Sequence, residues 1–504
     1  MTRSSLVNLP RVRLALVGVS RDCFPVELTR RRLAAVVCAL KERRDADFDF
    51  HPVSTIIENE THAMQALDEA GREGCNAAVL FLGNFGPETP TTIFAQRFAG
   101  PLMAVAAAEE DKAVLANDRG DALCGLLNCS YNLRMRNLRA YIPQAPVRDA
   151  KGVADEAAFF ARAARVAVGV KNLKLFGFGP RPADFVACNA PIKQLYDLGV
   201  EVMENSELDL LALFEDAARH PEEIDAVADA MRVELRDVAY PDLLPKLARY
   251  EVALKKFLEA NLGSRAFGAF ANKCWPAFER FFRFVPCYVN ARLAGQGYPV
   301  ACEVDLYGAL SEYMVMCATQ LPATILDVNN SCPAEVVPEK TDLKGASAAD
   351  LFMGFHCGNT CMAHLDGCAM KYQVIMNRGL EGARTPDITR GTLEGRLKAG
   401  PITFFRLQGA AEGGLRSYIA EGEILPVDPC TFGGTGVFAI PHFSRFYRHV
   451  LIGGGFPHHG AVGFAKAGAV LFEAVKMLGV DTIGVPLPPS IPYPGENPFA
   501  RTFV

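Results

Sequence analysis

Short segments of uninterrupted apolar residues alternate with helical patterns through the first third of the sequence. Residues 14–19, 77–82 and 102–106 are segments of this kind. Strands that are apolar on both faces need helices on both faces, as in a parallel, doubly wound sheet. Ligands bind such sheets at the loops that follow the carboxyl ends of the strands. The pattern predicts an α/β fold, with a first Rossmann-like domain at residues 1–160.

The same pattern begins again near residue 170. Residues 173–180 read as an opening strand and turn, and helical patterns dominate residues 206–262. After Asp327 the segments become short, β-rich and punctuated by glycine, which is typical of a β-rich domain. We therefore expect a second doubly wound α/β domain at residues 161–325 and a β-rich C-terminal domain at residues 326–504.

Composition and charge exclude several classes of function. The chain has 504 residues and a formal net charge of −5, with no Lys/Arg-rich run that would indicate nucleic acid binding. No apolar run reaches the roughly 18 residues that span a bilayer, and residues 14–19 are too short for a signal peptide. The fifteen cysteines are odd in number and lie mostly in apolar runs, which favours reduced thiols. We expect a cytoplasmic protein without nucleic acid or membrane partners.

Three acid and imidazole side chains follow predicted strands or loops at widely separated places. They are Glu303 after residues 298–302, Asp327 after residues 323–326, and His459 within the glycine-rich segment 453–460. Two carboxylates and one imidazole can hold a divalent cation and leave positions for substrate oxygens. Carboxylates in such a site can also move protons between the carbons of a sugar.

Each of these residues has a simpler interpretation that the sequence leaves open. Glu303 and Asp305 stand before a helical pattern, where either could cap the helix. Asp327 precedes a polar loop and could form an Asx-turn. His458 and His459 could be surface or structural residues, and if they share a strand they point to opposite faces. At most one of the two histidines is then expected to bind a metal.

Two other patterns suggest ligand sites only weakly. His356, Cys357, Cys361, His364 and Cys368 have loose zinc-site spacing, but no Cys-x2-Cys pair accompanies them, so a loop with buried thiols is favoured. The glycine-rich turns at 177–179, 433–436 and 453–455 do not form the G-x-G-x-x-G or P-loop patterns. Nicotinamide and ATP chemistry are therefore disfavoured.

Several of these segments together resemble the L-fucose isomerase / L-arabinose isomerase superfamily, and its fucose isomerase branch in particular. The resemblance is carried by residues 301–310, the strand end at 325–327, residues 393–407 and Phe456-Pro457-His458-His459. It implies a metal-dependent enzyme that interconverts an aldose and a ketose, such as L-fucose, D-arabinose or L-arabinose, through a cis-enediol.

The resemblance also implies roles for individual residues. Glu303, Asp327 and His459 would bind a divalent cation, most often Mn²⁺, since the family's ligand is the later histidine of its pair. Glu303 and Asp327 would also act as catalytic acid and base. A homo-oligomer, a trimer or hexamer, is implied as well.

Candidate substrate contacts are Lys273, Trp275, Arg21 and His458. Lys273 could anchor an anionic or extra-hydroxylated substrate, or equally point to solvent beside Trp275, the only tryptophan. Arg21 follows the first predicted strand, and family members can complete a site from a neighbouring subunit. Two alternatives to an isomerase remain: a sugar-binding protein without catalysis, and a related metal-dependent epimerase or lyase.

Overall fold

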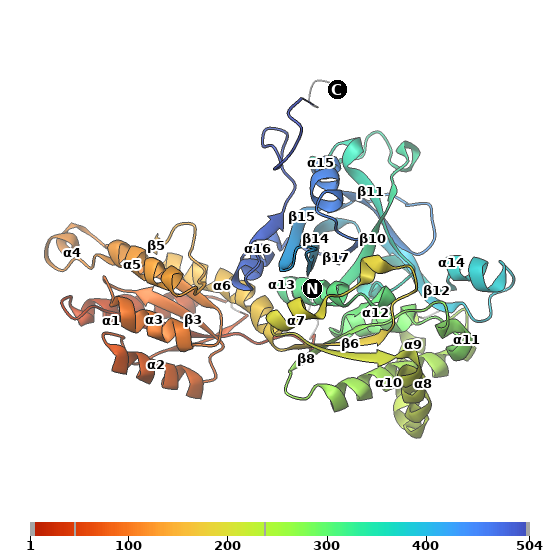
Figure 1. Cartoon of the computed structure of the whole chain (residues 1–504), viewed down its shortest axis with the longest axis horizontal. Helices are drawn as coiled ribbons and strands as arrows, with labels where there is room; N and C mark the ends of the chain where they lie inside the picture. Colours follow the sequence, from red (N-terminus) through yellow and green to blue (C-terminus); the bar gives the residue numbers. More distant parts are fainter. Residues whose placement is uncertain (1–5, 45–46, 236–237, 500–504) are drawn as a thin grey trace. The chain divides into compact units, whose positions relative to one another are not determined.

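The computed structural model describes residues 6–44, 47–235 and 238–499 and is drawn in Figure 1. The chain divides into two compact units. The N-terminal unit comprises Pro10–Gly169 and Ala469–Gly479, and the main unit comprises Met1–Leu9, Val170–Gly468 and Val480–Val504. Among the helices of the described residues, none has the length and apolar character needed to cross a bilayer.

The N-terminal unit is built on a parallel five-stranded sheet in the order β2-β1-β3-β4-β5. Its strands are β1 (Arg13–Val19), β2 (Asp49–Pro52), β3 (Ala77–Leu82), β4 (Leu102–Ala107) and β5 (Val147–Arg148). Its helices are α1 (Val26–Glu42), α2 (Glu60–Arg72), α3 (Glu88–Arg97), α4 (Lys112–Asn117), α5 (Ala122–Met135), α6 (Ala150–Lys171) and α16 (Gly468–Met477). Every residue of β3 and β4 is buried, which is why these strands are apolar throughout.

The main unit begins with a parallel four-stranded sheet in the order β7-β6-β8-β9. Its strands are β6 (Leu173–Gly179), β7 (Glu201–Ser206), β8 (Phe267–Ala271) and β9 (Val300–Ala301). The helices of this part are η1 (Val186–Cys188), α7 (Ile192–Asp197), α8 (Glu207–Asp216), η2 (Ala217–Arg219), α9 (Pro221–Leu235), η3 (Pro241–Leu243), α10 (Leu244–Asn261), α11 (Phe278–Phe282), α12 (Cys287–Gln296), η4 (Cys302–Val304) and α13 (Leu306–Thr319).

The rest of the main unit is a mixed nine-stranded sheet in the order β12-β13-β16-β11-β10-β17-β14-β15-β18. The strands are β10 (Ala323–Ser331), β11 (Leu351–His356), β12 (Leu365–Tyr372), β13 (Arg390–Leu397), β14 (Gly400–Gly409), β15 (Leu415–Ile424), β16 (Gly434–Ala439), β17 (His459–Gly463) and β18 (Thr482–Gly484). Between them lie η5 (Ala334–Val336), η6 (Ala348–Asp350), η7 (Met362–His364), α14 (Val374–Met376), η8 (Asn377–Glu381), α15 (Phe443–Phe446) and η9 (Tyr447–Ile452). An additional pairing of β15 with β16 closes the middle of the sheet into a barrel.

Helix α13 packs against both sheets of the main unit, since it contacts β6, β8 and β9 as well as β10, β14 and β17. Its residues from Leu306 to Ala318 are all buried. One hydrophobic core continues from Phe176 of the parallel sheet to Phe404 and Phe438 of the barrel. The N-terminus of α13 is therefore held where the parallel strands end beside the barrel.

The predicted fold class is confirmed: parallel α/β sheets are followed by a β-rich C-terminal region. The division into three domains stays a prediction, and the parallel sheet and the barrel fall within one compact unit. Strand β10 differs from expectation because it continues to Ser331, so Asp327 lies inside the strand rather than at its end. An irregularity in the pairing of β10 with β11 follows Asp327, between Val328 and Asn330.

Candidate active site

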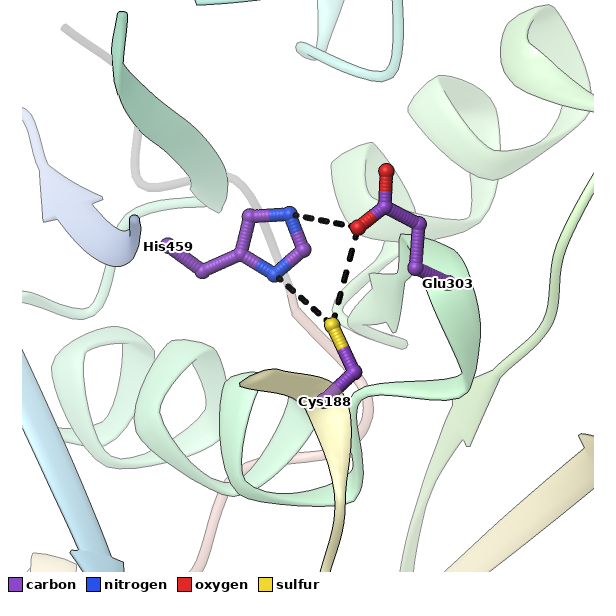
Figure 2. A group of neighbouring side chains, drawn as sticks. All are labelled: Cys188, Glu303 and His459. Atoms are coloured by element: carbon purple, nitrogen blue, oxygen red, sulfur yellow. Dashed lines mark hydrogen bonds and ion pairs between the residues drawn. The ribbon is translucent and has the colours of Figure 1, made fainter. Parts of the chain in front are cut away.

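Glu303 is presented by an unusual turn between β9 and α13. Both Glu303 and Val304 have left-handed backbone angles, with φ of +60° and +57°. A β-branched residue such as valine rarely adopts this conformation. A bond from the Val304 amide to the Asn272 carbonyl, 2.9 Å long, holds the turn against the end of β8. The turn directs the Glu303 carboxylate toward His459 (Figure 2).

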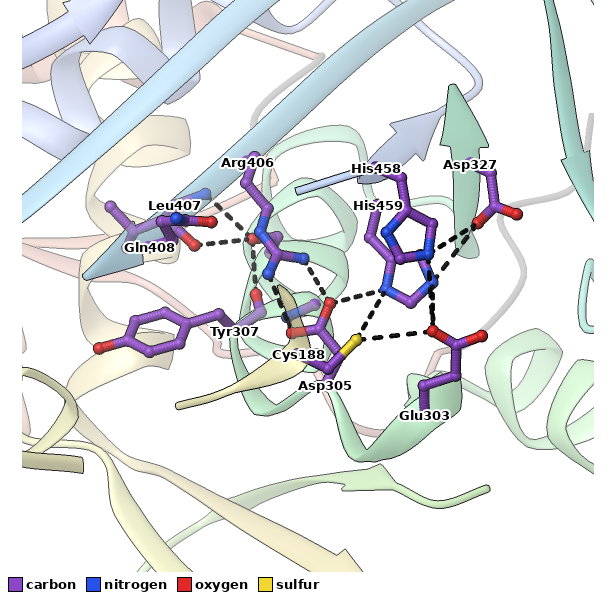
Figure 3. A network of polar contacts seen from close by, with 12 residues as sticks. Cys188, Glu303, Asp305, Tyr307, Asp327, Arg406, Leu407, Gln408, His458 and His459 are labelled. Atoms are coloured by element: carbon purple, nitrogen blue, oxygen red, sulfur yellow. Dashed lines mark hydrogen bonds and ion pairs between the residues drawn. The ribbon is translucent and has the colours of Figure 1, made fainter. Parts of the chain in front are cut away.

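Asp327 and His459 meet because they are direct partners across the antiparallel strands β10 and β17. Side chains of paired residues lie on the same face of a sheet. His459 Nε2 lies 3.4 Å from Asp327 Oδ1 and 3.5 Å from Glu303 Oε2 (Figure 3). Both His459 Nε2 and Asp327 Oδ1 are buried and have no hydrogen-bond partner. The three residues that the sequence singled out are therefore brought together around two unsatisfied polar atoms.

The opposite nitrogen of His459 belongs to a hydrogen-bonded cluster. His459 Nδ1 lies 2.8 Å from Asp305 Oδ2, and Asp305 accepts two bonds, of 2.6 and 3.0 Å, from the Arg406 guanidinium. Asp305 also accepts from the Gly308 amide at 2.8 Å, so it caps α13. Of the two acids before the helix, Asp305 is the cap, and Glu303 is free for another role.

The charges of this cluster shift the pKa values of both partners. Burial would raise the pKa of Asp305, but Arg406 and His459 outweigh it and hold that pKa below its usual range. Burial would lower the pKa of His459, but the bonds to Asp305 and Cys188 raise it well above its ordinary value. An ionised Asp305 accepts the Nδ1 proton of His459, which orients the ring with Nε2 toward Glu303 and Asp327.

Cys188 is a member of the site that sequence reasoning missed. It ends η1, in the loop after β6, and its Sγ lies 3.5 Å from Glu303 Oε2 and 3.9 Å from His459 Nδ1 (Figure 2). Burial raises the pKa of the thiol, which keeps it protonated and able to donate to Glu303. The available signal was its place after the first strand of the second α/β pattern, where ligand loops occur.

His458 also turns toward the carboxylates, contrary to the expectation that only one histidine would. Its Nε2 lies 3.5 Å from Glu303 Oε2 and 3.9 Å from Asp327 Oδ1, and its side chain is 33% exposed. The strict alternation of a strand does not apply, because β17 begins at His459 and His458 precedes it. Burial would raise the pKa of Glu303, but His458, His459 and His356 together hold it below its ordinary value.

The three other candidate substrate contacts, Trp275, Lys273 and Arg21, each have different neighbours. Trp275 contacts Phe185 edge-on at 5.6 Å between ring centroids, and Phe185 contacts His458 in the same way at 5.8 Å. Lys273 is buried rather than directed to solvent, and its Nζ lies 3.2 Å from Glu207 Oε2. Arg21 belongs to the N-terminal unit, where it lies over the Phe85 ring. The roles of all three as substrate contacts stay predictions.

The geometry favours one region for a metal. Within the described ranges, the groups of side chains placed to hold an ion are Cys188, Glu303 and His459, and Asp327, His458 and His459. Both groups belong to this site, and neither contains Cys357, Cys361, His364 or Cys368. The interpretation of the segment 356–368 as a loop with buried thiols rather than a zinc site stays a prediction.

Two family models match the chain. One describes the N-terminal domain of fucose/sulfoquinovose isomerase and matches residues 15–171, and the other describes the C-terminal domain of L-fucose isomerase and matches residues 354–485.

The curated relatives that the chain matches are sulfoquinovose isomerases. A sulfoquinovose isomerase of Alkalicoccus urumqiensis is 27% identical over 275 residues, which cover 53% of this chain and 54% of the relative. Sulfoquinovose isomerases of Priestia aryabhattai and Clostridium sp. (strain MSTE9) are 24% and 27% identical, over 63% and 60% of this chain and 66% and 62% of the relatives. The matches thus span between about half and two thirds of the length of these relatives.

Proposed function

We propose, on the premise that this chain belongs to the fucose isomerase-like family, that it is a metal-dependent aldose–ketose isomerase. The observation that carries the proposal is the meeting of Glu303, Asp327 and His459 around two buried, unbonded polar atoms. Buried polar atoms in proteins are almost always bonded, so a pair of exceptions facing one another indicates a place for a ligand.

The side chains present fit a divalent cation. Glu303 and Asp327 supply carboxylate oxygens, and His459 supplies Nε2 while Asp305 holds its other nitrogen. Oxygen ligands with one imidazole suit Mn²⁺, which is the cation that we propose. The bond from His459 to a carboxylate is the usual support of a metal-binding histidine. When bound, the cation would stabilise negative charge that develops on the sugar oxygens.

The two carboxylates can perform the proton transfers of the isomerisation. One removes the proton from C2 of the open-chain aldose, while the carbonyl oxygen O1 gains a proton and a double bond forms between C1 and C2. Return of a proton to C1 and loss of the proton on O2 convert this cis-enediol to the ketose. Glu303 and Asp327 approach the His459 ring from different elements, so they can serve different atoms of one sugar.

The substrate that we propose is a hexose with a sulfonate group, sulfoquinovose. The names of the relatives support it over the L-fucose, D-arabinose or L-arabinose-like sugars that the family resemblance first implied. A trimeric or hexameric assembly and a cytoplasmic location stay predictions.

The alternatives fit the arrangement less well. A sugar-binding protein without catalysis gives no reason for the three candidate ligands to lie together, and they do lie together. An epimerase or lyase would use similar enolate chemistry, and its products would differ from a ketose isomer.

The test is conversion of aldose to ketose by protein stripped with a chelator, with and without added Mn²⁺. The panel contains sulfoquinovose, 6-deoxyhexoses and pentoses, and the products are identified by NMR. We expect conversion only with metal, loss of conversion in Glu303→Gln, and normal conversion in Glu335→Gln, an exposed acid outside the site. Conversion that is independent of metal, or cleavage to smaller products, would contradict the proposal.

A further inference from the structure

A cavity of about 590 Å³ adjoins the candidate active site. It lies at the carboxyl ends of β6 and β7 and against the turn that carries Glu303. Its walls include Gly179, Arg181, Cys188, Asn189, Glu204 and Val304. In the strand order β7-β6-β8-β9, the two strands that follow β6 in the sequence, β7 and β8, lie on opposite sides of β6. The strand order therefore reverses at β6, which makes its carboxyl end the topological switch point of the sheet. Ligands of open α/β sheets bind at this position.

Two residues of the cavity wall are neighbours of the catalytic group. Cys188 forms part of the wall, and its Sγ touches both Glu303 and His459. Val304, the neighbour of Glu303 in the turn, forms another part. A molecule in the cavity therefore lies against two neighbours of Glu303.

Arg181 is a cation of the cavity wall, and no acid of the described residues forms an ion pair with it. Its Nη1 donates to the Ala183 carbonyl at 3.2 Å, and in the described part of the chain no carboxylate oxygen lies within 4.0 Å of its guanidinium. Two buried cations of the main unit are paired: Arg406 with Asp305, and Lys273 with Glu207. Lys273, which the sequence suggested as an anchor for an anionic substrate, already has a counter-ion.

The other polar groups of the wall suit a sugar rather than a simple anion. Glu204 is exposed, and its carboxylate can accept bonds from hydroxyl groups. Asn189 is exposed as well and carries both donors and acceptors. The wall thus combines one cation for a charged group with neutral and acceptor groups for hydroxyls.

We propose that Arg181 is a specificity-determining residue that binds the sulfonate of an anionic sugar while C1 and C2 face Glu303 and Asp327. The inference rests on the proposed function. Five carbon–carbon bonds of about 1.5 Å separate C1 from C6, so an extended hexose spans about 6 Å. The guanidinium donates paired, charge-assisted bonds to oxyanions, which gives it the geometry for a sulfonate.

The experiment compares sulfoquinovose with 6-deoxyglucose, which has the same ring and no sulfonate. Wild type, Arg181→Gln, Arg181→Lys and Arg219→Gln are assayed with Mn²⁺. Arg219 is an exposed arginine of the same unit, outside the cavity wall, and serves as the matched control. Arg181→Gln is expected to lower the ratio of kcat/KM for the sulfonated over the uncharged sugar tenfold to a hundredfold, mainly through KM. Arg181→Lys is expected to restore part of it, and Arg219→Gln to leave it unchanged.

If Arg181→Gln has the same ratio of kcat/KM for the two sugars as wild type, the inference is overturned. The proposed isomerase function is unaffected by that result. Failure of wild type to convert either sugar contradicts the proposed function instead, and calorimetric binding of sulfoquinovose then tests Arg181 separately. Weaker binding to Arg181→Gln than to Arg219→Gln supports the inference, and equal binding overturns it. Circular dichroism and Tm of each variant exclude a folding defect, and Arg181→Lys supplies the second substitution at the same position.

Discussion

The two edges of the His459 ring face very different surroundings. On the Nδ1 edge, Asp305 and Arg406 form an ion pair with side chains only 2% exposed, and the pair also caps α13. On the Nε2 edge, Glu303 and Asp327 approach to about 3.5 Å without a hydrogen bond (Figure 3). His459 Nδ1 has its hydrogen-bond partner within the protein, and we propose that Nε2 finds its partner in a ligand.

This difference separates the residues that position from those that bind and react. A buried ion pair fixes geometry because breaking it leaves an unpaired charge away from water. Unsatisfied polar atoms lower stability, so a folded protein that keeps them together generally uses them for a ligand. Substitutions on the two edges should therefore have different signatures.

The largest effect is expected on the Nε2 edge. Asp327→Asn and Glu303→Gln keep the size of each side chain but remove a proton acceptor and an anionic ligand. We expect turnover to fall about a thousandfold or more, because both proton transfer and charge stabilisation are lost. The measurement is initial rate at saturating Mn²⁺, together with Tm, which should stay within a few degrees of wild type. Substantial activity in both variants would refute the catalytic assignment.

On the Nδ1 edge, Asp305→Asn should damage stability as well as metal binding. The substitution leaves the Arg406 guanidinium buried without a counter-ion, which costs about 3–5 kcal/mol of unfolding free energy. Loss of the carboxylate behind His459 should weaken metal affinity about tenfold to a hundredfold. Urea denaturation and calorimetric metal titration measure the two effects. The control is the double variant Asp305→Leu/Arg406→Met, which removes both charges and should unfold less readily than Asp305→Asn.

A substitution of Cys188 tests which edge of the His459 ring binds the cation. Its thiol lies beside His459 Nδ1, the nitrogen already bonded to Asp305, and beside Glu303. We expect Cys188→Ala to change metal affinity less than tenfold, because the cation is placed at the Nε2 edge. Calorimetric titration with Mn²⁺ checks this expectation. A loss beyond about a hundredfold would move the metal to the group of Cys188, Glu303 and His459.

A separate effect, on stability rather than on the site, concerns Glu312, a fully buried acid on α13. Burial raises its pKa to about 8, and nearby Asp305 adds to the rise. Between pH 5 and 8 the unfolded chain then carries the ionised carboxylate while the folded protein keeps it protonated. The contribution of Glu312 to unfolding free energy therefore falls with rising pH, by about 1.4 kcal/mol per unit.

Glutamine at position 312 cannot ionise, so Glu312→Gln should gain stability relative to wild type as the pH rises through this window. Urea denaturation of metal-free protein at pH 5.5, 6.5 and 7.5 measures the difference. Parallel stability curves for the two proteins would show that Glu312 is not protonated in the folded state.

The sequence predicted those parts of the fold that depend on local pattern. Residues 14–19, 77–82 and 102–106 became β1, β3 and β4 because strands buried on both faces have few alternatives. Closure of the barrel was not predictable, since it depends on the pairing of β15 with β16 and not on any short segment. The continuation of β10 past Asp327 was missed for a similar reason, because the polar residues Asn330 and Ser331 gain their partners from β11.

The two acids and the imidazole of the site could be predicted from the sequence, but the residues that hold them in place could not. Glu303, Asp327 and His459 are chemically conspicuous, and the structure brings them together. Arg406 had one signal, a charged residue inside a strand whose neighbours are apolar, which in a buried strand requires a counter-ion. Cys188 had only its place in the loop after β6 as a signal, because the role of a thiol in a loop depends on the side chains next to it.

The left-handed turn at Glu303 and Val304 has a consequence for attempts to engineer this protein. Glycine would relieve the strain of valine at φ +57°, which is worth on the order of 1–3 kcal/mol. A screen for heat resistance alone could therefore favour Val304→Gly. The same substitution would allow the turn more conformations and would remove part of the cavity wall. Directed evolution of this chain should thus select for stability and turnover together, because at this turn the two requirements conflict.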